Sequence, residues 1–90
     1  MRITDIGGEF ALIERLCAHA PVMHKDLLAG IGDDAAVISG IQADGSHLLV
    51  TTDMLVENSH FKCDWAAPEQ IGIKSVVCNV SDIAAMGGTP

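Results

Sequence analysis

Residues 35–53, "AAVISGIQADGSHLLVTTD", decide how the middle of the chain folds. Two β-rich runs, residues 35–41 and 48–52, lie on either side of the stretch 43–46. That stretch contains the Asp-Gly pair that is typical of tight turns between antiparallel strands. The segment therefore predicts a β-hairpin.

Helical patterns flank the hairpin on both sides. In residues 8–20, Phe10, Ile13, Leu16 and Cys17 recur at the spacing of one face of an amphipathic helix. A second, longer pattern covers residues 68–86, after an irregular segment at 55–67.

The second pattern has helix signals at both ends. Pro68 suits the first turn, where Glu69 adds a favourable negative charge, and Gly87-Gly88 followed by Pro90 is typical of a helix end. The sequence thus predicts an α+β fold with an N-terminal helix, a β-hairpin and a long apolar helix.

Composition limits the classes of function. The chain has 90 residues, enough for one small domain, and a formal net charge of −7, which disfavours nucleic acid and anionic membranes as partners. No signal sequence or long uninterrupted apolar stretch is evident, so we expect a cytoplasmic protein. Cys17, Cys63 and Cys78 lack metal-site spacing, which favours buried free thiols over a disulfide or zinc framework.

Acidic residues mark one end of the expected hairpin. Asp33 and Asp34 precede the first strand and Asp53 follows the second, so antiparallel pairing brings them to the same end. Carboxylates so close repel one another unless they are solvated, protonated or neutralised by a cation. The neighbouring hydroxyls of Thr51 and Thr52 make the donor set all oxygen, which suits Mg²⁺, Mn²⁺ or Ca²⁺ rather than Zn²⁺.

Each of these acids also has an ordinary structural interpretation. Asp33 and Asp34 fit a turn, and Asp53 fits a strand end or a helix N-cap. Asp82 is harder to explain, because a carboxylate in an apolar helix is costly unless it is paired, metal-bound or solvated. Asn79 shares its face of the helix. Spacing alone leaves a common metal site and separate structural roles equally open.

Four stretches together carry a resemblance to a known family. "GEFALIERL", "GIGDDAAVI", "LLVTTDMLVENSHF" and "IGIKSVVCNVSDIAAMGGTP" resemble, in this order and spacing, the N-terminal domain of thiamine-monophosphate kinases. These enzymes belong to the superfamily of aminoimidazole ribonucleotide synthetase and selenophosphate synthetase. The strand end and the "SD" helix look like the superfamily at large, whereas "GEF" and "NSHF" are closer to the kinases.

The resemblance implies transfer of the γ-phosphoryl group of ATP to thiamine monophosphate, with Mg²⁺ ions held between acidic residues and phosphates. It implies that His60 contacts the thiamine substrate; without it, His60 would be a surface loop histidine. No catalytic nucleophile is expected. The ligands implied for magnesium are Asp34, Thr51, Thr52, Asp53 and Asp82.

The resemblance also sets expectations for the rest of the protein. Family members are longer, so residues 1–90 are expected to form part of an ATP- and magnesium-binding N-terminal domain, inactive alone and lacking the C-terminal domain. Family N-terminal domains pair through their sheets, which implies a homodimer. Two alternatives remain: another ATP-using enzyme of the superfamily, such as selenophosphate synthetase, and a non-enzymatic remnant that binds a metal or a partner.

Overall fold

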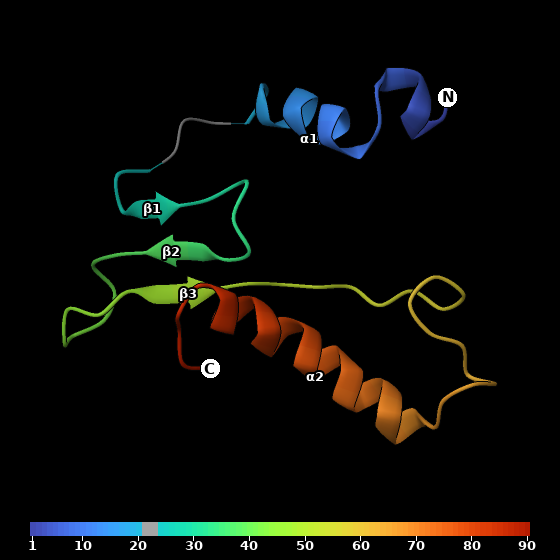
Figure 1. Ribbon diagram of the computed structural model, residues 1–90. Helices are drawn as coiled ribbons and strands as arrows, with labels where there is room; N and C mark the ends of the chain where they lie inside the picture. Colours follow the sequence, from blue (N-terminus) through green and yellow to red (C-terminus); the bar gives the residue numbers. More distant parts are fainter. Residues whose placement is uncertain (21–23) are drawn as a thin grey trace.

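The computed structural model describes residues 1–20 and 24–90 (Figure 1). These residues form an α+β arrangement, as the sequence predicts, with two α-helices and a three-stranded antiparallel sheet. Its elements are the 3-10 helix η1 (Ile3–Ile6), α1 (Glu9–Cys17), β1 (Leu27–Ala29), β2 (Ala36–Ile38), β3 (Leu48–Val50) and α2 (Pro68–Ala85).

The predicted β-hairpin is confirmed. Strands β2 and β3 pair antiparallel, with Ala36 opposite Val50, although each strand is shorter than the β-rich run that predicts it. In the connecting turn, an Asp44 carboxylate oxygen accepts hydrogen bonds from the Ser46 hydroxyl at 2.6 Å and from its backbone N–H at 2.9 Å. Both bonds favour the ionised carboxylate and lower the pKa of Asp44 below its ordinary value. Gly45 supplies the left-handed conformation, with φ of 81°.

Strand β1 is an element that the sequence pattern does not indicate. Its residues, Leu27–Ala29, include no β-branched or aromatic side chain and are too few to show a period. The strand exists because it pairs with β2, with Leu27 opposite Ile38, and its register shifts before Ala29. The sheet order is therefore β1-β2-β3, with β2 in the centre.

Helix α2 ends as the two glycines predict. Gly87 has a left-handed φ of 73° and its N–H bonds to the Ala84 carbonyl at 2.9 Å. The N–H of Gly88 bonds to the Ile83 carbonyl at 3.0 Å. These two bonds form a Schellman motif, which satisfies carbonyls that the end of a helix leaves without partners.

The arrangement is open, and little of it is fully buried. Among the described residues only Ala35 is fully buried, at 4% exposure. The radius of gyration is 16.6 Å, whereas a compact domain of this length has about 12 Å. Apolar side chains of α2 remain exposed, Ile73 at 64%, so the burial expected of an apolar helix is not realised along its length. No helix in residues 1–20 and 24–90 is long and apolar enough to cross a membrane.

The three cysteines are free thiols, as expected, but the expectation that they are buried is wrong for Cys63. This residue is exposed in the loop before α2, whereas Cys17 and Cys78 are partly buried. A hydrogen bond with the nearby Glu57 carboxylate raises the pKa of the Cys63 thiol. The higher pKa keeps this exposed thiol protonated, so it is a poorer nucleophile at neutral pH.

Candidate functional site

Thr51 joins the two halves of the expected metal site. It follows β3, and its hydroxyl lies 3.0 Å from the backbone carbonyl oxygen of Asp34, to which it donates a hydrogen bond. The same hydroxyl oxygen lies 3.4 Å from a carboxylate oxygen of Asp82 in the last turns of α2. Figure 1 shows the end of α2 approaching β3. The fold thus brings Asp34, Thr51 and Asp82 together from three separate segments.

The other two expected ligands lie just beyond this contact. Asp53 is exposed, and one of its carboxylate oxygens accepts a hydrogen bond from the N–H of Met54 at 2.7 Å. Thr52 is also exposed. Both residues follow Thr51 directly in the chain, but their side chains are not part of the contact between Thr51 and Asp82.

The donor types at this junction fit a hard cation. A hydroxyl, a backbone carbonyl and a carboxylate are oxygen ligands of the kind that Mg²⁺ prefers. Within the described ranges 1–20 and 24–90, however, the structure forms no group of three or more His, Cys, Asp or Glu side chains that could hold a metal ion. The chemistry of the donors therefore fits, while the full ligand set stays a prediction.

His60 belongs to a tightly bonded loop between β3 and α2. The N–H of Val56 donates to the His60 ring nitrogen Nδ1 at 2.9 Å, and the N–H of His60 donates back to the Val56 carbonyl at 2.9 Å. Asn58 has a left-handed φ of 65°, and its N–H bonds to the Phe61 carbonyl at 2.7 Å. Because Nδ1 is an acceptor, the neutral His60 ring carries its proton on Nε2, which is left to donate to a ligand.

Lys74 fastens this loop to α2. Its ammonium group donates a hydrogen bond to the carbonyl oxygen of His60. The sequence does not reveal this role, because one lysine on a helix is compatible with a solvated side chain as readily as with a contact. The bond ties the position of His60 to the helix that also carries Asp82.

A surface pocket of about 260 Å³ opens at the same loop. Lys62 and Trp65 lie on its wall, with the Lys62 ammonium nitrogen 4.4 Å from the centroid of the Trp65 ring, which is a cation–π contact. Sequence reasoning missed both residues. The available signal was the single tryptophan in a chain with 3% aromatic residues. The pocket is lined by Asn58, Ser59, His60, Phe61, Lys62 and Trp65.

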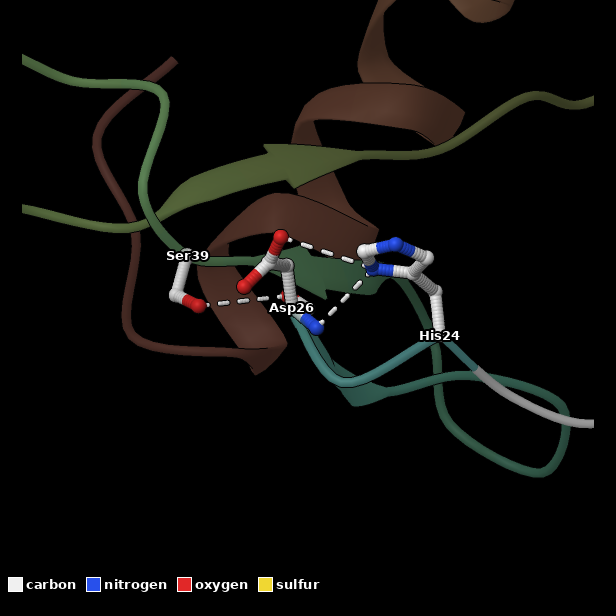
Figure 2. Close-up of polar contacts among 3 residues, drawn as sticks. All are labelled: His24, Asp26 and Ser39. Carbon is white, nitrogen blue, oxygen red and sulfur yellow. Dashed lines mark hydrogen bonds and ion pairs between the residues drawn. The ribbon is translucent and has the colours of Figure 1, made fainter.

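A second polar group brings together His24, Asp26 and Ser39, the residue types of a hydrolase triad (Figure 2). The Ser39 hydroxyl donates to the backbone carbonyl of Asp26 at 3.4 Å, not to the imidazole. The backbone N–H of Asp26 donates to Nδ1 of His24 at 3.2 Å, and an Asp26 carboxylate oxygen lies 3.4 Å from the same nitrogen. A triad requires the serine to face the histidine, so this group instead fastens the start of β1 to the end of β2.

The chain is similar in sequence to thiamine-monophosphate kinases of several bacteria. A thiamine-monophosphate kinase of Mycobacterium tuberculosis is 45% identical over 80 residues, which is 89% of this chain and 23% of the relative. One from Bacillus subtilis is 43% identical over 82 residues, covering 91% of the chain and 24% of the relative. One from Corynebacterium glutamicum is 54% identical over 59 residues, 66% of the chain and 18% of the relative.

The chain spans about a quarter of the length of the first two relatives. No solved structure matches it. Residues 32–90 match the family model described as AIR synthase related protein, N-terminal domain. This match begins just before Asp33 and includes Thr51, His60 and Asp82. From the hairpin onward, the chain belongs to the family of AIR synthase related proteins and represents their N-terminal domain.

Proposed function

We propose that the protein containing this chain transfers the γ-phosphoryl group of ATP to the phosphate of thiamine monophosphate. A P–O bond of ATP breaks, a new P–O–P linkage forms, and the products are thiamine diphosphate and ADP. The observation that carries the proposal is the 45% identity to a thiamine-monophosphate kinase across 89% of the chain. The oxygen-rich junction at Thr51 supports it.

In this proposal the junction holds magnesium and the nucleotide phosphates. The magnesium, when bound, neutralises charge on the phosphate oxygens during transfer. Through its contacts with Asp34 and Asp82, Thr51 connects the segment before β2, the end of β3 and helix α2. The acceptor phosphate is already a nucleophile, so a separate nucleophilic side chain is unnecessary. The proposed ligands are Asp34, Thr51, Thr52, Asp53 and Asp82.

His60 is the proposed contact with thiamine monophosphate. Its Nε2–H is the free donor of a ring whose other nitrogen is engaged with Val56. Lys74, which anchors the His60 loop, and Asp82 lie on the same helix. An α-helix rises 1.5 Å per residue, so the two residues are about 12 Å apart along its axis. The helix that carries Asp82 therefore also anchors the loop that carries His60.

The proposal extends to assembly and location. Residues 1–90 would form part of an ATP- and magnesium-binding domain in a cytoplasmic enzyme that pairs as a homodimer through the sheet. The exposed apolar side chains of the described residues support association with further protein surface. Light scattering of the full-length protein at micromolar concentration tests the dimer, and a monomeric mass would contradict it.

The activity is tested by incubating the full-length protein with ATP, magnesium and thiamine monophosphate and separating the thiamine phosphates by chromatography. We expect thiamine diphosphate to accumulate in proportion to ADP. Thiamine without its phosphate, supplied in parallel, should give no thiamine diphosphate, because it offers only a hydroxyl oxygen and lacks the phosphate oxygen that accepts the γ-phosphoryl group in this reaction. Failure to form thiamine diphosphate, together with ATP-dependent use of selenide, would transfer the assignment to the selenophosphate synthetase alternative.

A further inference from the structure

The pocket beside His60 concentrates the aromatic side chains of this chain. The sequence contains one tryptophan, two phenylalanines and no tyrosine, and both Phe61 and Trp65 line this one pocket. Trp65 is 77% exposed. Exposing so much of an indole ring to water is unfavourable, so the exposed ring is a candidate surface for binding a ligand.

The backbone holds Trp65 and Lys62 on the same side of the loop. The N–H of Trp65 bonds to the Lys62 carbonyl at 3.0 Å, and the N–H of Ala66 bonds to the same carbonyl at 3.2 Å. This single turn places the two side chains near one another, and the ammonium nitrogen lies 4.4 Å from the ring centroid. The positively charged ammonium group of Lys62 therefore already lies over the face of the indole ring.

The rest of the pocket wall is fixed before any ligand arrives. Hydrogen bonds within residues 56–61 define the loop, and Lys74 holds the His60 carbonyl from α2. His60 belongs to this wall. Lys62 is the adaptable part, because a lysine side chain is long and flexible and an exposed cation–π contact is weak.

We propose that the indole face of Trp65 binds a planar cationic ring of the ligand and that Lys62 occupies this face only until the ligand displaces it. The proposal rests on the function proposed above, because the thiazolium ring of thiamine monophosphate is such a cation. Tryptophan has the most favourable face for a cation among aromatic side chains. Lys62 is then an internal competitor, not a phosphate contact.

Calorimetry on the full-length protein tests this proposal with two ligands. One is thiamine monophosphate; the other is its neutral analogue, in which carbon replaces the charged ring nitrogen. Trp65→Leu should weaken binding of the cationic ligand roughly five- to tenfold and leave binding of the neutral analogue nearly unchanged. Trp65→Phe should lie between, and Phe10→Leu, which changes an aromatic residue that is 86% exposed on α1, should alter neither.

Lys62→Met provides a test of opposite sign. Removing the competing charge should tighten binding of thiamine monophosphate about two- to fivefold, by the strength of an exposed cation–π contact. Weaker binding in Lys62→Met would mean that Lys62 contacts the phosphate and would overturn its role as competitor. Equal losses of both ligands in Trp65→Leu, or no loss of either, would overturn the role of Trp65.

A separate measurement distinguishes this proposal from the proposed function. If the wild-type protein binds no thiamine monophosphate, the function fails, and N-methylthiazolium becomes the probe. Its effect on tryptophan fluorescence is measured as the difference between wild type and Trp65→Phe. Quenching that depends on Trp65 supports a cation-binding face regardless of the reaction, and no such quenching rejects it.

Discussion

Asp82→Asn should lower thiamine diphosphate formation by the full-length protein by more than about a hundredfold. A magnesium ion held by carboxylates would contribute several kcal/mol of charge stabilisation in phosphoryl transfer, and about 1.4 kcal/mol corresponds to a tenfold change in rate. Asparagine has nearly the same shape and keeps an oxygen that can accept from Thr51. The loss should therefore come from the missing charge and not from a changed fold.

The assay is the chromatographic measurement of thiamine diphosphate, repeated over a series of magnesium concentrations. We expect the variant to require more magnesium for its residual activity. Glu14→Gln is the matched control, since it removes one carboxylate charge from an exposed position on α1 and should leave turnover unchanged. An Asp82→Asn enzyme with normal turnover and normal magnesium dependence would remove Asp82 from the proposed ligand set.

Gly88→Val should destabilise the protein, because this glycine lies where the end of α2 meets the sheet. A Cβ atom at Gly88 would lie 2.2 Å from Cδ1 of Leu49, 3.0 Å from Cγ2 of Ile83 and 3.3 Å from the Ile83 carbonyl oxygen. The Leu49 side chain can move aside, but the helix backbone cannot move as easily. Overpacking of this kind costs about 1–3 kcal/mol.

A glycine elsewhere in the same helix gives a control of opposite sign. A Cβ at Gly72 meets nothing within 4 Å, and Gly72 lies inside α2. Gly72→Ala should therefore stabilise the protein by about 0.5–1 kcal/mol, since glycine is a poor helix former. Thermal unfolding followed by circular dichroism compares the variants. Equal midpoints for Gly88→Val and wild type would show that α2 does not dock on β3 through Gly88.

The sequence predicted those helices and strands whose limits are set by residues close together in the chain. The Asp-Gly turn predicted the β2–β3 hairpin, and Pro68 with the Gly87-Gly88 pair predicted both ends of α2 to within a residue. Strand β1 was missed because its partner β2, not its own three residues, makes it a strand. The exposed apolar residues of α2 could not be anticipated either, since periodicity does not tell whether a partner surface is present.

The candidate site divides in the same way. Antiparallel pairing predicted that Asp33 and Asp34 lie at the same end of the hairpin as Asp53, and the structure shows Thr51, two residues before Asp53, bonded to the Asp34 carbonyl. Asp82 was suspected because it interrupts an apolar helix, and its carboxylate lies 3.4 Å from the Thr51 hydroxyl oxygen. The pocket at His60 was beyond sequence reasoning. Its form depends on a left-handed Asn58, on the His60 ring accepting from a backbone N–H, and on a lysine from another element. The spacing of residues in the sequence indicates none of these three features.

The junction at Thr51 also bears on how this site can change in evolution. Thr51 bonds to the main-chain carbonyl of residue 34, a group that every amino acid possesses. The joint between the strands is therefore insensitive to the side chain at position 34. Exchange of the Asp34 side chain, one of the proposed magnesium ligands, would change the donor set while this hydrogen bond persists. The proposed metal ligand and the contact between the two strand ends therefore depend on different atoms of residue 34, its carboxylate and its backbone carbonyl.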